Sequence, residues 1–147
     1  MALTALDPAD RVDQLIRLTD RLTELVALAA QAFENRRPQD AAAHADETAR
    51  LANLYRHEAA RVRADPTMVA AVPPALRLRL VRSTEAFDAV LARQGRALEA
   101  AKTVTEGLVR AIAEEVAIQR AQTNNYGPDA TTNSPGCATA ITLNRTA

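Results

Sequence analysis

The chain has 147 residues, of which 48% are apolar, 24% are charged and 3% are aromatic. Eighteen basic residues balance eighteen acidic ones, so no overall field attracts nucleic acid or an anionic membrane surface. The single cysteine, Cys137, excludes an intrachain disulfide and a cysteine-rich metal site. No signal peptide and no membrane-spanning stretch stand out, so we expect a soluble cytoplasmic protein without membrane insertion.

The first helix is predicted to begin at Asp7 and Pro8. Asp7 provides an oxygen that can cap a helix, and proline is well suited to the first helical position. The apolar residues that follow are separated by three or four positions, as on one face of an amphipathic helix. They are Leu15, Leu18, Leu22, Leu25 and Ala29.

Pro38 predicts a tight turn over residues 35–40, and a second helix is expected from Ala41 onward. Small residues at many of its apolar positions favour close packing on the first helix. Residues 65–74 contain three prolines, which end the second helix and predict an apolar loop that packs onto the bundle.

A third helix is expected from about Pro74, with one apolar face over about 45 residues. Its first part, residues 76–80, alternates leucine with arginine and also fits an edge strand. No second strand-like segment is available for pairing, so we interpret it as helix. Gly95 and Gly107 each weaken this helix by about 1 kcal/mol relative to alanine, without ending it.

The sequence therefore predicts an all-α fold: an antiparallel bundle made of a helical hairpin and a longer third helix, possessing coiled-coil-like faces. The bundle domain is expected over residues 1–120. Residues 121–147 are rich in threonine and asparagine and are expected to form a flexible C-terminal tail.

No residue pattern in the sequence clearly indicates a catalytic site. His57 and Glu58 begin like a zinc-protease helix, but Arg61 occupies the place of the second histidine. His44 lacks the sequence context of a phosphotransfer histidine. Cys137 has no base nearby in sequence. We therefore expect no enzyme activity, no catalytic residue, no cofactor and no metal.

Arginines of the third helix could form a basic strip for RNA or DNA, but aromatic stacking residues are missing from it. We expect the acidic first helix to neutralise this strip, and so no nucleic-acid partner. The strip comprises Arg77, Arg79, Arg82, Arg93 and Arg96.

The order of these parts resembles the FlgN-like flagellar export chaperones, including their FlbY-type branch. The resemblance rests on the leucine-rich residues 15–25, the turn with Pro38, residues 51–58, residues 106–109 and the Asn124-Asn125-Tyr126-Gly127 segment. It implies a cytoplasmic chaperone that binds hook-filament junction subunits and delivers them to the flagellar type III export apparatus.

In that family the last helix and tail bind the subunit. The resemblance places partner binding here on Leu108, Ile112, Val116, Tyr126, Ile141 and Leu143. The three helical residues could instead close an intramolecular core. Two other interpretations stay open: a self-association or adaptor module whose third helix forms a homodimer or larger oligomer, and a phosphotransfer partner using His44 or His57.

Overall fold

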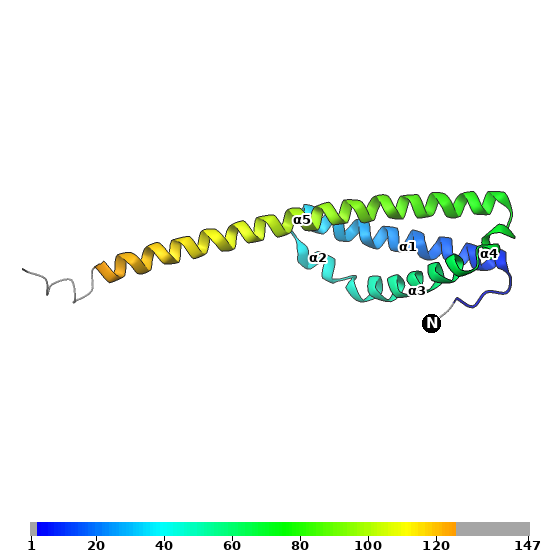
Figure 1. The fold of residues 1–147 in the computed structure, drawn as a ribbon, viewed down its shortest axis with the longest axis horizontal. Coiled ribbons are helices and arrows are strands. Elements are labelled where there is room, and N and C mark those ends of the chain that lie inside the picture. Colours follow the sequence, from blue (N-terminus) through cyan, green and yellow to red (C-terminus); the bar gives the residue numbers. More distant parts are fainter. Residues whose placement is uncertain (1–2, 126–147) are drawn as a thin grey trace, which may run out of the picture. The chain divides into compact units, whose positions relative to one another are not determined.

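The computed structural model of the chain describes residues 3–125, and these residues form five helices without any strand. The helices are α1 (Pro8–Glu34), α2 (Pro38–Ala42), α3 (Ala45–Ala64), α4 (Thr67–Ala70) and α5 (Pro74–Asn125) (Figure 1). The predicted all-α fold is thereby confirmed. The chain divides into two compact units, Met1–Val104 and Thr105–Ala147, and α5 contributes to both.

Helix α1 begins and ends with hydrogen-bonded caps. At its start, Oδ1 of Asp7 accepts a 2.7 Å hydrogen bond from the backbone N–H of Asp10, as the sequence predicts. At its end, Arg36 has a positive φ of 58°. The N–H groups of Arg36 and Arg37 donate to the carbonyls of Phe33 and Ala32, at 3.1 and 2.8 Å. This is the Schellman arrangement, here formed with arginine where glycine is usual.

The second predicted helix is present, but it begins at Pro38 rather than Ala41, so the turn covers residues 35–37 only, and it is interrupted. Residues 43 and 44 form a turn, so α2 and α3 are separate helices. Neither residue is glycine or proline, and the local sequence is rich in alanine, the best helix former. The sequence therefore favours one continuous helix, and the structure differs from this expectation at residues 43 and 44.

The proline-rich connection before α5 packs onto the bundle, as predicted. It contains the short helix α4, which the sequence pattern did not indicate. Val72 is buried against Val12 and Ile16 of α1, and the half-buried Val69 and Leu76 pack against the same cluster. The loop thus closes one end of the core of the first unit.

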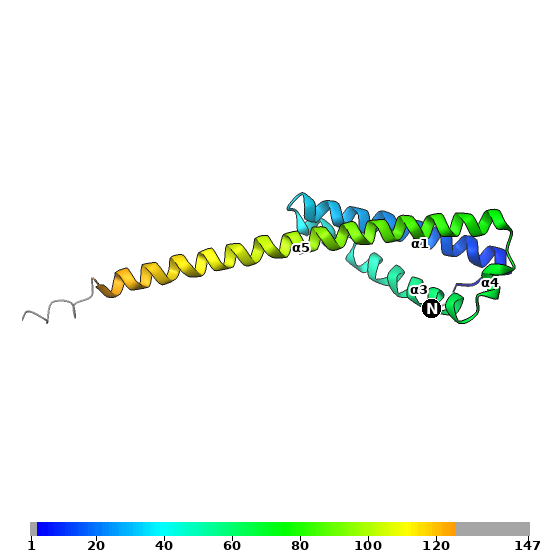
Figure 2. The same cartoon turned by 45° about the horizontal axis from the view of Figure 1, so that its top comes forward.

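Helix α1 is the centre of this first unit. In Figures 1 and 2 it lies beside the first part of α5, and α3 flanks it as well. The main cluster joins α1 to Phe87 of α5, whose ring meets Tyr55 of α3 edge-to-face at a centroid distance of 5.1 Å. The α1 residues of this cluster are Leu15, Leu18, Leu22 and Val26.

Polar contacts fix the directions of the helices. Ser83 of α5 donates a 2.6 Å hydrogen bond to Asp20 of α1, and Arg93 makes two hydrogen bonds to Glu34 at 2.8 and 2.6 Å. From the first contact to the second, the residue numbers increase along both α1 and α5, so these two helices run parallel. Arg21 of α1 pairs with Glu47 near the start of α3, whereas Arg11 near the start of α1 pairs with Glu58 farther along α3. Helix α3 is therefore antiparallel to both, as in the expected bundle.

Helix α5 continues through Gly95 and Gly107 to Asn125. Residues 121–125, which we expected to belong to the tail, are thus helical. The remainder of the predicted tail, including Cys137, lies outside the described residues. Across residues 3–125, no helix is long and apolar enough to cross a bilayer.

Candidate functional site

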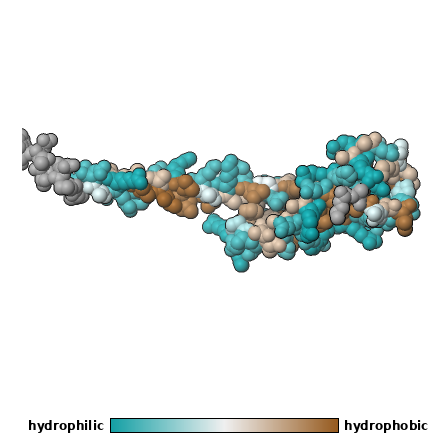
Figure 3. All heavy atoms as spheres, turned by 90° about the horizontal axis from the view of Figure 1, so that it is seen from below, coloured by the Kyte–Doolittle hydropathy of each residue, from teal (hydrophilic) through white to brown (hydrophobic). Residues whose placement is uncertain are grey.

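The part of α5 that belongs to the second unit has no buried residue. Every residue from Thr105 to Asn125 is exposed, although this segment is rich in valine, leucine and isoleucine. Figure 3 shows apolar side chains gathered on this part of the helix. An exposed apolar cluster of this kind is typical of a binding surface.

Four of these apolar residues form one stripe along the helix, which we call the 108–116 stripe. Because an α-helix turns by about 100° per residue, they fall within about 100° of each other. Leu108 is 59% exposed, Ile112 55% and Val116 40%, and Val109 lies beside them. Arg110 and Glu114 lie on the opposite side by the same geometry. Taken by itself, the segment is an amphipathic helix whose apolar side is uncovered.

The stripe contains three of the residues expected to bind a partner. Leu108, Ile112 and Val116 are exposed and take no part in the described core, so the interpretation that they close an intramolecular core gains no support from residues 3–125. Their binding role stays a prediction. The other expected residues, Tyr126, Ile141 and Leu143, lie outside the described residues, so the structure neither places them near the stripe nor away from it.

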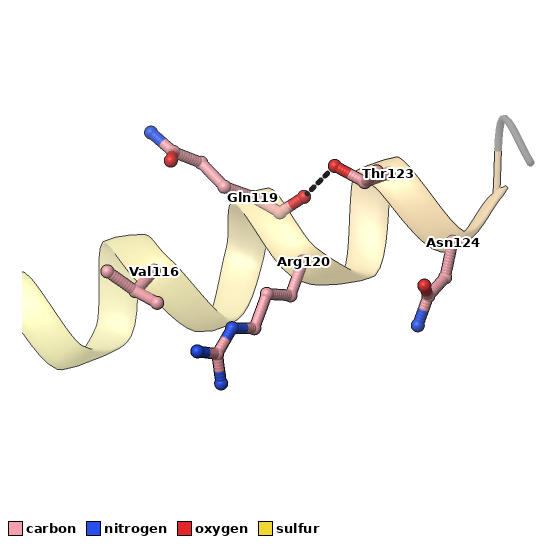
Figure 4. A pocket seen from close by; sticks show the side chains of 5 residues that line it. All are labelled: Val116, Gln119, Arg120, Thr123 and Asn124. Atoms are coloured by element: carbon pink, nitrogen blue, oxygen red, sulfur yellow. Dashed lines mark hydrogen bonds between the residues drawn. The ribbon is translucent and has the colours of Figure 1, made fainter.

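Beyond the stripe the surface becomes polar. Figure 4 shows Val116, Gln119, Arg120, Thr123 and Asn124, which line a hollow at the end of α5. The Thr123 hydroxyl donates to the Gln119 carbonyl at 2.9 Å, so it is occupied within the helix. All five residues come from one helix, so among residues 3–125 the hollow has a single wall and offers no enclosed site for a small molecule. It can instead extend a protein-binding surface with hydrogen-bonding groups.

The histidines do not converge on any site in the described chain. His44 lies in the turn between α2 and α3, and His57 lies on α3; both are exposed. No group of three metal-ligating side chains occurs within residues 3–125. The phosphotransfer interpretation therefore has exposed histidines and no described feature that singles out either of them.

Glu58 is a feature that the sequence interpretation missed. Its side chain is 1% exposed, and its carboxylate lies 3.5 Å from the guanidinium groups of both Arg11 and Arg61. It also accepts a 3.1 Å hydrogen bond from the backbone N–H of Leu3. The residue that looked like part of a failed zinc motif is thus a buried structural carboxylate. Its burial depends on α1 and the N-terminal segment, which the motif itself does not reveal.

A second hollow lies within the first unit, between α1, α3 and α5. It has a volume of about 240 Å³ and is lined by Leu15, Tyr55, Ala59, Val62, Arg63, Leu80 and Thr84. Burial raises the pKa of the Tyr55 phenol above its ordinary value, with Asp88 adding to the rise. The Thr84 hydroxyl donates to the Leu80 carbonyl. The hollow therefore offers apolar contacts, and its groups do not form an acid–base pair.

Comparison with known proteins gives one strong relationship. The flagellar basal-body protein FlbY of Caulobacter vibrioides is 59% identical to this chain over 149 residues, and the match covers the whole of both chains. No protein-family model matches the chain. No solved structure matches it either.

Proposed function

Because this chain belongs to the family of the flagellar protein FlbY, we propose that it acts in flagellar assembly, as a cytoplasmic export chaperone without enzymatic activity. In this role it binds hook-filament junction subunits and delivers them to the flagellar type III export apparatus. The FlbY relative supports the flagellar part of the proposal. The resemblance to FlgN-like chaperones, described from the sequence, supports the chaperone part.

The observation that carries the proposal is the uncovered 108–116 stripe. A helical segment with one apolar side is suited to bind an amphipathic helix of a partner, whose own apolar residues would otherwise face water. Burial of an apolar side chain contributes about 1.5–3 kcal/mol. Four such side chains can therefore supply much of the free energy of a reversible complex, which a chaperone that must release its cargo requires.

The test is binding of the purified full-length chain to each hook-filament junction protein of the source cell, measured by titration calorimetry. The double variant Leu108→Ala/Ile112→Ala should lose about 2 kcal/mol of binding free energy, or roughly thirtyfold in affinity. The matched control Arg110→Ala/Glu114→Ala alters the opposite side of the same turns and should bind normally. Circular dichroism of both variants checks that the helix persists.

A version ending at Arg120 separates the helical stripe from the tail residues Tyr126, Ile141 and Leu143. Loss of binding in this version alone would place the decisive contacts in the tail. Loss in the stripe variant alone would place them on the helix. If the full-length chain binds none of the junction proteins, the chaperone assignment is wrong and only the flagellar relationship remains.

The same stripe also fits a second copy of the chain, so self-association is the alternative function. The expected signature is a dimer whose light-scattering mass depends on concentration, persists in the version ending at Arg120, and disappears in Leu108→Ala/Ile112→Ala. A constant monomer mass up to high concentration would remove this alternative and leave the stripe free for cargo.

A further inference from the structure

The first three turns of α5 carry apolar residues on two sides, although one side suffices for the core. Leu76 and Leu80 pack inward against the clusters around α1. Leu78 and Val81 are each 50% exposed. Pro74 is exposed as well, and the 74, 78, 81 spacing aligns these three residues on one outer stripe. The leucine–arginine alternation noted in the sequence thus becomes, in a helix, an inner and an outer apolar face.

Arginines flank this outer stripe on both sides. Arg77 and Val81 are four residues apart, as are Leu78 and Arg82, so the four side chains form two adjacent rows on the helix surface. We call Pro74, Arg77, Leu78, Val81 and Arg82 the 74–82 patch.

The charges of this patch are not neutralised by the bundle. Arg79 pairs with Asp13 and Arg93 with Glu34, as expected for a strip facing an acidic helix. No carboxylate within the described residues forms an ion pair with Arg77 or Arg82, and both are exposed. Residues 66–84 include no acidic residue at all, and Glu85 marks the end of the patch.

We propose that the 74–82 patch is a docking surface for an acidic amphipathic helix of a partner protein. The apolar side of such a helix covers Leu78 and Val81, and carboxylates on its two edges meet Arg77 and Arg82. This arrangement follows from charge complementarity around an apolar centre. An anionic membrane is a poorer fit, because polybasic membrane contacts generally use about four to eight cations and this patch offers two.

This surface is separate from the 108–116 stripe and does not rest on the proposed chaperone function. It consists of residues of the first unit, whereas the stripe belongs to the second.

The test uses a fluorescent synthetic peptide of about 18 residues, long enough for a stable amphipathic helix, with leucine along one face and glutamate in the flanking rows. A twin peptide has lysine in place of glutamate. The full-length chain should bind the glutamate peptide saturably in an anisotropy titration. Arg77→Glu/Arg82→Glu should weaken this binding at least about tenfold and create binding of the lysine peptide. Leu78→Ala/Val81→Ala should weaken binding of the glutamate peptide and, in the charge-reversed background, binding of the lysine peptide.

Two control variants localise the effect. Arg50→Glu/Arg56→Glu makes the same change in net charge at exposed positions of α3 and should bind the glutamate peptide normally. Leu91→Ala/Leu98→Ala removes exposed apolar side chains of the same helix outside both surfaces and should also bind it normally. The proposal is overturned if the wild-type chain does not bind the peptide, or if either control loses as much affinity as the patch variants. Vesicles containing phosphatidylglycerol provide the last arm: binding to them that requires Arg77 and Arg82, without peptide binding, would identify the patch as a membrane contact instead.

Discussion

Leucine, valine and alanine make up similar fractions of helices α1 and α5, but the two helices have very different environments. Ten of the 27 residues of α1 are buried, whereas three of the 52 residues of α5 are, namely Ser83, Phe87 and Ala97. Helix α1 is surrounded by its neighbours and organises the first unit. Helix α5 supplies one side to that unit, and many of its other apolar residues are exposed within the described range 3–125. The apolar content of a helix therefore indicates that it can pack against another element, and the topology of the chain decides whether that element lies in the same chain.

The sharpest test of this contrast compares two truncations to alanine. Leu22→Ala in α1 removes a side chain that is 1% exposed and should lower the free energy of unfolding by about 3 kcal/mol. Ile112→Ala in α5 should change it by less than about 0.5 kcal/mol. Urea unfolding followed by circular dichroism measures both. Equal losses would mean that the α5 side chain is buried in solution and that the contrast is false.

The next largest effect concerns Glu58. Replacement by Gln keeps a group that can accept from the Leu3 N–H but removes the charge between Arg11 and Arg61. The variant leaves the partly buried guanidinium groups of Arg11 and Arg61 without their carboxylate, so we expect a loss of about 2 kcal/mol. The control Glu114→Gln, on the exposed part of α5, should be neutral. A neutral Glu58→Gln would show that the two arginines are adequately hydrated without the carboxylate.

A smaller effect, of opposite sign, is expected at Gly107. A methyl group at this position meets no atom within 4 Å, so alanine fits without a clash. Alanine should stabilise the surrounding helix by about 0.8 kcal/mol. Because this part of α5 lies outside the core, slower amide hydrogen exchange over residues 105–112 should report the gain while the urea midpoint stays constant. A shift of the urea midpoint would instead mean that this segment unfolds together with the core.

The smallest effect is the dependence of stability on pH. Hydrogen bonds from Arg93 hold the pKa of Glu34 below its ordinary value of 4.5, and those from Arg21 do the same for Glu47. A depressed folded-state pKa means that the stabilisation is complete above about pH 4.5 and is lost as the pH falls through the folded-state value. Both pairs are exposed, so the loss is modest. Urea midpoints measured from pH 6 downward should decline less steeply in Glu34→Gln/Glu47→Gln than in the wild-type chain, and identical slopes would contradict this assignment.

The features predicted correctly from sequence are those set by neighbouring residues. The start of α1 follows from Asp7 and Pro8, the turn from Pro38, and the start of α5 from the prolines before it. The interruption at Ala43 and His44 has no signal in the alanine-rich sequence, and the burial of Glu58 could not be predicted because it depends on contacts with Arg11 of α1 and with Leu3. The 108–116 stripe was recognisable from its spacing. Its exposure was left open between a partner-binding surface and an intramolecular core, because it depends on which other elements of the chain are available to cover it.

The buried contacts of Glu58 also determine how α1 and α3 can align. The interface between these helices is built largely from alanine, leucine and valine, and such surfaces fit nearly as well after a shift of one helical turn. A shift of about 5.4 Å would carry the carboxylate away from Arg11 and from the Leu3 N–H, and keep beside it only Arg61 of its own helix among the partners described. This buried acidic residue, together with the exposed Arg21–Glu47 pair, thereby specifies the register of an otherwise permissive interface. The Glu58 contacts act by raising the free energy of the slipped alignments, and not by making the native alignment unusually stable.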